Sequence, residues 1–164
     1  MSNDLAADLK KAIPQVPFAV SETKTEMDIS VAPEHFLTFA RELQARKELA
    51  FDYLRNVTAI DMQEAGLTAK YNFWSFKHHR SLQVTVATPP GQPNVPSITG
   101  IYPAANWHER EAAEMVGLVF DGHPNPKNLL LEEDLRIHPL LKAHPLQKVE
   151  ILQGIEDSRP GFDF

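Results

Sequence analysis

Cysteine is absent from this sequence of 164 residues. Without thiols, the chain forms no disulfide and offers no cysteine ligand to an iron–sulfur cluster or a zinc ion. Positive charge is also scarce, because 16 Lys and Arg residues stand against 22 Asp and Glu residues. The resulting net charge of −6 provides no basic footprint for nucleic acid, so we expect no nucleic-acid partner.

Long hydrophobic runs are missing as well. The longest apolar runs span a few residues, whereas a transmembrane helix needs roughly 20. The first residues, Met-Ser-Asn-Asp, do not form the basic region that precedes the apolar part of a secretory signal. We therefore expect neither a signal peptide nor a transmembrane segment.

Proline is abundant but unevenly distributed. Of 13 prolines, ten fall from Pro89 onward. Because proline fixes φ and removes a backbone donor, regular elements are expected mainly before this point, and extended segments and turns after it. We divide the chain into an α+β domain at 1–103, a charged helix with its following turn at 104–124, and an extended arm at 125–164.

Hydrophobic periodicity predicts the elements of the first part. Residues 35–49 carry an apolar stripe opposite charged residues, which is typical of a helix lying on a sheet. We also expect a helix at 5–13, strands at 16–20, 27–31, 56–61, 70–76 and 81–87, a surface connector at 88–96 and a brief strand at 97–101. This order predicts an α+β fold: a mostly antiparallel sheet with helices on one face, followed by an extended Pro-rich C-terminal arm.

The most distinctive stretch, residues 106–124, joins these two parts. We expect a helix that begins near Ala104 or Asn106, with Asn106 as a candidate N-cap. Gly117 suits the position just past a helix, where the backbone becomes left-handed. An apolar triplet and a Gly-His-Pro turn follow at 118–124.

The charges on this helix permit two structural interpretations. Trp107, Glu111 and Met115 fall on one stripe, while Arg110 and Glu114 lie four residues apart, where an ion pair can form. Such charges contribute little when solvated and more when another surface covers them. The helix is therefore either a solvated face or a docking surface. In the second case, Arg110 should matter more for assembly than for the stability of the isolated chain.

Two catalytic alternatives use the same segment. His108, Glu111 and His123 could bind a metal ion in a small metal-dependent enzyme, although the Glu-x-x-His pattern of di-iron helices is reversed here and has no second copy. Glu109, Glu111 or His123 could act as a general acid or base, but no nucleophile or phosphate-binding loop accompanies them.

The arm places apolar residues beside prolines without helix or strand periodicity. Such a segment is poor material for a core of its own. It suits an extended arm laid on another protein.

Several motifs resemble the respiratory complex I 30-kDa subunit family, the C subunits of NADH-quinone oxidoreductases. Residues 106–124 are similar to the family signature, roughly W-x-E-R-E-x-x-D-x-F/L-G-I-x-F-x-G-H-P. Residues 96–106 are similar to the lead-in to that signature, and residues 138–142 resemble its H-P-L-R-K segment. The resemblance covers about residues 51–146.

The resemblance implies a cofactor-free accessory subunit in the hydrophilic arm of a complex I-like NADH:quinone oxidoreductase. Such a subunit packs on the large 49-kDa-like subunit, next to an iron–sulfur subunit, and supports assembly and electron transfer to quinone. It is not catalytic by itself, the iron–sulfur clusters belong to other subunits, and the complex holds it peripherally at the cytoplasmic face of the membrane. The residues implied in a partner interface or a structural role are Trp107, Glu109, Arg110, Glu111, Glu114, Gly117, Phe120, Gly122, His123, Pro124, Pro139 and Lys142.

The sequence also departs from this pattern. Glu114 stands where the family usually has Asp, and Val116 replaces a larger apolar residue. Leu141 and Ala143 replace an Arg and an Asp, which removes a charge pair from the arm. A second possibility is therefore the equivalent subunit of an energy-converting membrane-bound nickel–iron hydrogenase or a formate hydrogenlyase-type complex.

Overall fold

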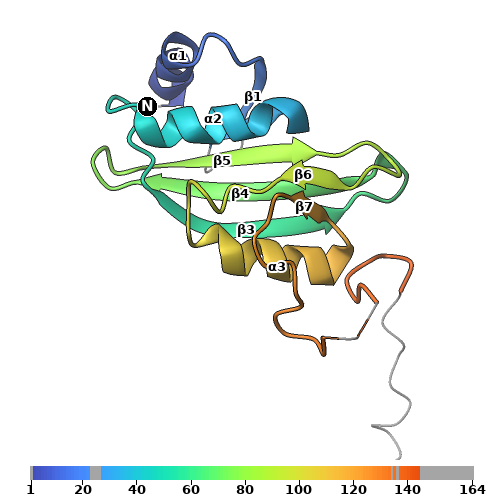
Figure 1. Ribbon diagram of the computed structural model, residues 1–164. Coiled ribbons are helices and arrows are strands. Elements are labelled where there is room, and N and C mark those ends of the chain that lie inside the picture. The colour runs from blue at the N-terminus through green and yellow to red at the C-terminus, as the bar shows by residue number, and fades with distance from the viewer. Residues whose placement is uncertain (1, 23–26, 134, 136, 145–164) are drawn as a thin grey trace, which may run out of the picture.

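The computed structural model describes residues 2–22, 27–133, 135 and 137–144. Its helices are α1 (Ser2–Ala12), α2 (Pro33–Ala45), the short 3₁₀ turn η1 (Gln63–Ala65) and α3 (Ala105–Val116). Its strands are β1 (Phe18–Glu22), β2 (Met27–Val31), β3 (Tyr53–Asp61), β4 (Leu67–Ser75), β5 (Arg80–Ala87), β6 (Asn94–Pro96) and β7 (Val119–Asp121). The predicted α+β fold is confirmed (Figure 1). None of the helices in these ranges has the length and hydropathy needed to cross a bilayer.

Five strands form one sheet in the order β1-β2-β5-β4-β3. Neighbouring strands are antiparallel except β2 and β5, which pair in parallel with Ile29 opposite Val84. The chain leaves β2 through α2 and returns at the far edge as β3. The β3-β4-β5 meander then brings β5 back beside β2, so the sheet is mostly antiparallel as expected.

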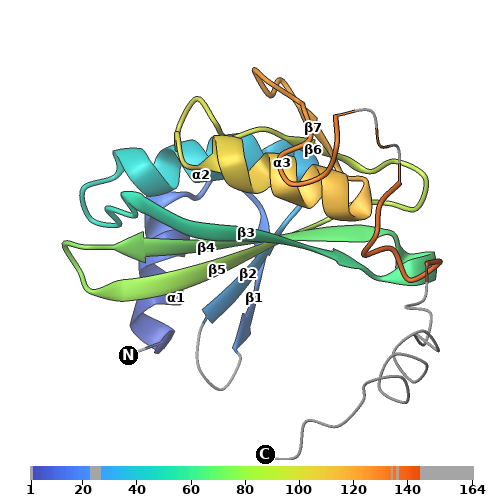
Figure 2. The ribbon, with the colours of Figure 1, turned by 90° about the horizontal axis from the view of Figure 1, so that it is seen from below.

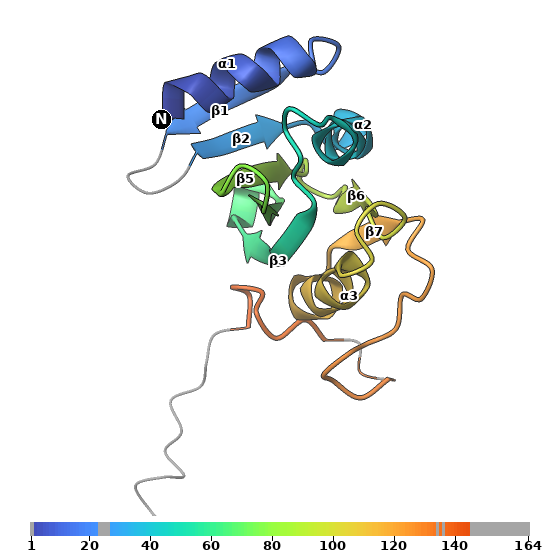
Figure 3. The ribbon, with the colours of Figure 1, turned by 90° about the vertical axis from the view of Figure 1, so that its left-hand side faces the viewer.

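One face of this sheet carries the core. Side-chain alternation along β4 and β5 turns Tyr71, Phe73, Leu82 and Val84 to that face, and all four are fully buried. The helices α2 and α3 both lie on it, while α1 runs beside β1 at the edge (Figures 2 and 3). Buried residues of α3 and β7 belong to the same core as the strands, so α3 is part of one folded unit with the sheet.

The predicted surface connector at 88–96 ends in a strand instead. β6 pairs in parallel with β7, separately from the main sheet, and Val95 is fully buried. Prolines are compatible with this arrangement because Pro93 and Pro96 stand at the two ends of a short strand. The backbone N–H groups that they lack would not be needed for hydrogen bonds between inner strands of a sheet.

The strand predicted at 97–101 is wrong. The chain turns in this segment, and the Ile98 carbonyl accepts the N–H groups of Ile101 and Tyr102. The turn brings Tyr102 under the sheet end, where its hydroxyl donates to the Phe51 carbonyl (2.7 Å). The residue pattern at 97–101 therefore does not produce a strand. The segment forms a turn that leads directly into α3.

Other boundaries differ by a few residues. α2 ends at Ala45 rather than near residue 49, and the Leu49 N–H instead donates to the Arg46 carbonyl in a turn. β3 begins at Tyr53, earlier than predicted, because a register shift around Arg55 lets the strand continue past the expected start.

Candidate functional site

The helix α3 ends where the sequence predicts. Gly117 adopts a left-handed φ of 82°, and its N–H donates to the Ala113 carbonyl. At the other end, Ala104 occupies the N-cap position and provides no side-chain cap. Asn106 is therefore not the cap. It lies in the first turn, and its buried side-chain Oδ1 has no hydrogen-bond partner among the described residues.

Glu109 lies on the inner face of α3 and is fully buried. Its carboxylate accepts hydrogen bonds from the Ser97 hydroxyl (2.6 Å) and from the Ile98 N–H (2.9 Å). These bonds fasten the turn before α3 to the middle of the helix. Burial raises the pKa of Glu109 to about 7, because the two hydrogen bonds offset only part of the cost of desolvating the charge.

Tyr71 places a second buried polar group beneath α3. Its hydroxyl has no hydrogen-bond partner in the part of the chain that the structure describes. Burial, and then the negative charge of Glu109, raise the pKa of Tyr71 well above its usual value. Sequence spacing placed Glu109 among surface charges, whereas the fold places it beside this orphaned hydroxyl in the core.

Arg110 contacts the arm rather than Glu114, so the expected ion pair is not formed within the described part of the chain. Its Nε donates to the Lys127 carbonyl (2.7 Å) and its Nη2 to the Asn128 carbonyl (2.6 Å). The guanidinium also lies over the Trp107 ring, 5.4 Å from the ring centroid. Arg110 is thus already engaged in the isolated chain, contrary to the expectation that docking alone would desolvate it.

Glu114 holds the next part of the arm by its backbone. The buried carboxylate accepts N–H groups from three successive residues, Leu129 (2.8 Å), Leu130 (3.0 Å) and Leu131 (3.3 Å). Successive amides turned toward one anion form a favourable electrostatic arrangement. Arg110 therefore binds carbonyls and Glu114 binds amides of adjacent residues in the same loop.

The later arm caps the C-terminal end of α3. His138 donates from Nδ1 to the Glu114 carbonyl (2.8 Å), and the Leu140 N–H donates to the Met115 carbonyl (2.9 Å). Carbonyls in the last turn of a helix have no intrahelical partner, so these bonds satisfy them. A Cβ at Gly117 would come within 2.9 Å of the His138 ring. Gly117 therefore has two roles. It adopts the left-handed conformation that ends α3, and it leaves room for the His138 ring of the arm.

A last bond joins the arm to the sheet. Asp61, at the end of β3, accepts the Lys142 N–H (2.9 Å). This bond and another from the Gln63 N–H lower the pKa of Asp61. Lys142 contributes its backbone here, and Pro139 is half-buried within the same segment.

The Gly-His-Pro turn is fastened to the start of α3. His123 Nδ1 accepts the Asn125 N–H (3.0 Å), which places the ring proton on Nε2, where it is donated to the Asn106 carbonyl (3.2 Å). Burial lowers the pKa of His123 and so favours the neutral ring that both bonds require. Gly122 provides the left-handed turn at φ 80°, and Phe120 is buried in the core.

The metal-binding alternative is not assembled in the structure. Within the described ranges, no three His, Asp or Glu side chains are placed to hold one ion. His123 has both ring nitrogens engaged, while His108 is half-buried and Glu111 is exposed. A cavity of about 320 Å³ does lie between α3, β7 and the arm, but Arg110 and Glu114 line it with groups already bonded to the backbone.

The outer surface of this region exposes several large apolar side chains beside an exposed ion pair of Lys127 and Glu133. Leu130, Ile137 and Leu140 of the arm are 65%, 52% and 61% exposed, and Trp107 of α3 is 59% exposed. The arm therefore presents its backbone to α3 and several of its large side chains to solvent. Figure 2 shows the arm passing around the end of α3.

Several residues of this site were not identified from the sequence. Asp61 and Asn128 carry no periodic or motif signal, and Ser97 lies in the lead-in to the signature without a role that its position predicts; each makes its contact with a residue distant in the chain. His138 falls within the H-P-L segment that prompted the resemblance, but its capping role is visible only in three dimensions.

Residues 29–150 match the family described as respiratory-chain NADH dehydrogenase, 30 Kd subunit. The chain belongs to this family. The match spans α2, the β3–β5 meander, α3 and the described arm, so the site lies inside it. The resemblance inferred from the signature is therefore confirmed.

Relatives in this family are the C subunits of NADH-quinone oxidoreductases. One from Roseiflexus sp. (strain RS-1) is 34% identical over 134 residues, covering 80% of this chain and 77% of the relative. Another, from Roseiflexus castenholzii, is 35% identical over 136 residues, covering 82% and 78%. A third, from Salinispora arenicola, is 32% identical over 143 residues, covering 84% and 58%.

Solved structures share the fold of this family member. The trypsin-resistant fragment of Nqo5 has a TM-score of 0.61 at 20% identity, covering 76% of this chain and 99% of the fragment. A chain of the membrane-bound sulfane sulfur reductase, an archaeal respiratory membrane complex, has a TM-score of 0.74 at 17% identity, covering 99% and 95%. At these identities the likeness concerns the fold alone.

Proposed function

We propose that this 30-kDa-family chain is an accessory subunit of the hydrophilic arm of a complex I-like NADH:quinone oxidoreductase. It packs on the large 49-kDa-like subunit, beside an iron–sulfur subunit, and supports assembly and electron transfer to quinone. It is held peripherally at the cytoplasmic face of the membrane, binds no cofactor itself, and leaves the iron–sulfur clusters to its partners. The family membership and the relatives named above support the type of complex.

One observation carries the docking part of this proposal. The arm is tethered through its backbone, by Arg110, Glu114 and the helix end, while Leu130, Ile137 and Leu140 face solvent. Exposed apolar side chains on an ordered segment present a surface that a partner can bury at little further cost in conformational entropy. Trp107 lies beside Arg110 and extends this surface onto α3.

The proposal is tested by changing only the outward side chains. In the double variant Leu130→Asp and Leu140→Asp, the tethers to α3 use backbone groups and persist, so the isolated chain should keep its melting temperature. Recovery of the large subunit with a tagged chain should fall at least about tenfold, because two carboxylates would have to be buried in the interface.

The matched control is Met62→Asp, which alters a similarly exposed apolar side chain outside the arm and α3. It should leave recovery of the large subunit unchanged. Full recovery with the double arm variant would refute docking through this surface.

The hydrogenase or formate hydrogenlyase alternative is not favoured, because the relatives at 34% and 35% identity are NADH-quinone oxidoreductase subunits. Identification of the proteins recovered with the tagged chain distinguishes the two types of complex. Metal analysis of the purified chain tests the proposal that it binds no cofactor, since stoichiometric iron, zinc or manganese would contradict it.

A further inference from the structure

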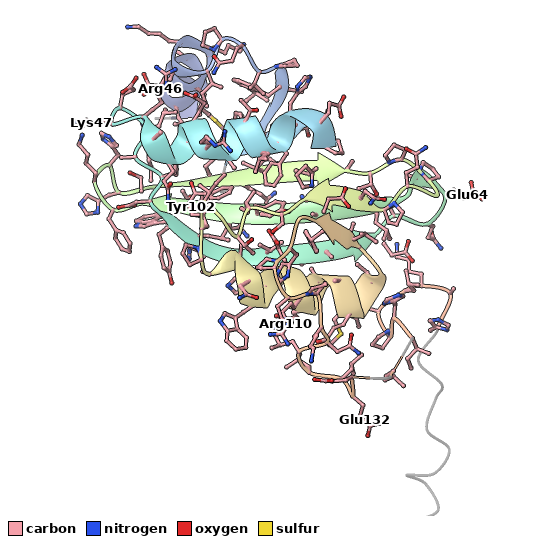
Figure 4. The ribbon with its side chains drawn as sticks, viewed as in Figure 1. Arg46, Lys47, Glu64, Tyr102, Arg110 and Glu132 are labelled. Atoms are coloured by element: carbon pink, nitrogen blue, oxygen red, sulfur yellow. The ribbon has the colours of Figure 1, made fainter. Side chains whose placement is uncertain are left out.

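A second surface lies at the opposite end of the molecule from the arm. The β4–β5 hairpin loop meets residues 46–49, which follow α2, and the start of β3. Figure 4 shows Arg46 and Lys47 at this end, Glu64 at the far end of the sheet and Glu132 below α3. We call this surface the basic end and define it by Lys47, Tyr53, Arg55, Trp74, Phe76 and Lys77.

Lys47, Arg55 and Lys77 provide exposed cations at the basic end, and the exposed carboxylates of Glu48 and Asp52 lie in the same segments. The two cations nearest to it, Arg46 and Arg80, are already paired with Glu42 and Asp8. Within the described residues, Lys47, Arg55 and Lys77 form no ion pair. Three cations that form no ion pair among the described residues thus gather at this end, beside the carboxylates of Glu48 and Asp52, in a chain whose net charge is −6.

The fold holds this surface in a fixed shape. Lys77 Nζ donates to the Lys47 carbonyl (3.0 Å), and His78 Nε2 lies 3.3 Å from the same oxygen. Arg80 Nη2 donates to the Glu48 carbonyl (3.0 Å). Only the carbonyl of Lys47 takes part in these bonds, and its ammonium group forms no ion pair with the described residues.

Aromatic rings lie among these cations. Tyr53 and Phe76 are 47% and 57% exposed, with ring centroids 5.5 Å apart. The Arg55 guanidinium lies over the Trp74 ring, 5.8 Å from its centroid. Exposed aromatic residues together with arginine are the composition that protein interfaces favour over ordinary surface.

We propose that the basic end binds an acidic, partly apolar surface of a neighbouring protein chain. Carboxylates of the partner pair with Lys47 and Lys77, and an apolar side chain packs on Tyr53 and Phe76. A protein fits better than an anionic membrane for two reasons. Electrostatic attachment to lipid commonly uses clusters of about 4–8 cations, more than are unpaired here, and the net charge of −6 disfavours approach to an anionic bilayer.

This interaction goes beyond the docking proposed for the arm, and it can fail independently. Because the β4–β5 hairpin loop and the arm lie on opposite sides of the molecule (Figure 1), the chain would contact different surroundings through each. Its role would then include bridging partners as well as capping one of them.

The test uses the native complex isolated through a tag on this chain. A zero-length carbodiimide cross-linker joins lysines to carboxylates in direct contact, and the products are identified by mass spectrometry. We expect cross-links from Lys47 or Lys77 to Asp or Glu residues of another chain. Acetylation of Lys47 should also be at least about tenfold slower in the complex than in the isolated chain. Full acetylation of both lysines in the complex, without such cross-links, overturns the proposal.

Charge reversal supplies the second measurement. Lys47→Glu alters an ammonium group that the fold does not use, so the isolated chain should melt as before, whereas the complex should release it at lower salt. Arg41→Glu, an exposed cation elsewhere on α2, is the matched control and should change nothing. An unchanged salt profile for Lys47→Glu overturns the proposal. So does binding of the isolated chain to phosphatidylglycerol vesicles that Lys47→Glu abolishes, or a cross-link that joins only two copies of this chain.

Discussion

The sheet with its helices and the arm are held by different kinds of contact. The first is one continuous apolar core, in which side chains such as Phe36, Tyr71 and Leu82 are fully buried. The arm is fastened mainly by hydrogen bonds between its backbone and α3. Apolar packing strengthens every element that shares it, whereas polar tethers act one at a time.

The helix α3 takes part in both arrangements, which explains why its charges were difficult to interpret from spacing. Its inner face buries Ala112 and Val116 together with Glu109, while Arg110 and Glu114 reach outward to the arm. This difference between apolar packing and polar tethers predicts that damage to the core unfolds the whole domain. Loss of a tether should release only the arm.

The largest effect is expected in the core. Phe36→Ala removes a fully buried ring of α2 and should lower the free energy of unfolding by about 3–5 kcal/mol. Urea denaturation should show the sheet and α3 unfolding together at lower denaturant. Leu130→Ala, at an exposed arm position, is the comparison and should change stability by less than about 0.5 kcal/mol. Similar effects of the two substitutions would remove the distinction between core and arm.

Glu109→Gln should act in the opposite direction, and only above acidic pH. The folded-state pKa is raised from 4.5 to about 7, so ionisation of Glu109 costs folding free energy. That contribution to stability is fully present below pH 4.5, falls through this interval and is lost above pH 7. The amide can still accept from Ile98 N–H and donate to the Ser97 hydroxyl.

The variant should therefore gain stability over the parent at pH 8, by up to about 3 kcal/mol, and little at pH 4. Urea denaturation across this pH range checks the sign. Parallel pH profiles for parent and variant would contradict a raised pKa for this carboxylate. A gain in stability of the variant at pH 8 would show that the ionised Glu109 carboxylate destabilises the folded core.

Many elements of the apolar core could be predicted from the sequence. Alternating residues in β5 and the stripe in α2 bury the faces they predicted, because periodicity reports directly on which side chains meet a core. Gly117 was also identified, because a left-handed C-cap has a local cause. β6 was not, because its partner β7 lies more than twenty residues away and flanking prolines suggested a loop.

The contacts between the arm and α3 could not be predicted from the sequence, for a physical reason. Arg110 and Glu114 bind main-chain groups, and every residue offers those, so no side-chain pattern marks their partners. The expectation that the arm lies on another protein was incomplete, since its described residues lie on α3 of the same chain. Residues 145–164 of the predicted arm lie outside the described residues.

Glu114→Ala should release part of the arm while the core stays folded. It removes the acceptor for three backbone N–H groups, which is a loss of about 1.5–3 kcal/mol in local stability. Amide exchange at residues 129–131 should accelerate about ten- to a hundredfold, with slow exchange kept in β4 and β5. Glu111→Ala, on the exposed side of α3, is the matched control. If β4 amides accelerate equally, the arm and the core form one cooperative unit.

Gly117→Ala is expected to have the smallest effect, about 1–2 kcal/mol, from a left-handed φ and a clash with His138. The two causes can be separated in a His138→Ala background, where the clash is relieved and the backbone cost remains. Thermal denaturation of the four chains gives both contributions. Gly100→Ala, which meets open space, should be neutral. If Gly117→Ala lowers stability equally in the His138→Ala background, a clash between the added Cβ and the His138 ring contributes nothing.

The tethering of the arm by its main chain also affects how freely its sequence can change. Arg110 and Glu114 bind the same carbonyl and amide groups whichever side chains occupy 127–131, provided that no proline removes a donor at 129–131. Libraries that randomise the outward positions should therefore give folded proteins often, whereas α3 tolerates few replacements. The arm could thus be redesigned for a different partner without re-engineering the fold beneath it.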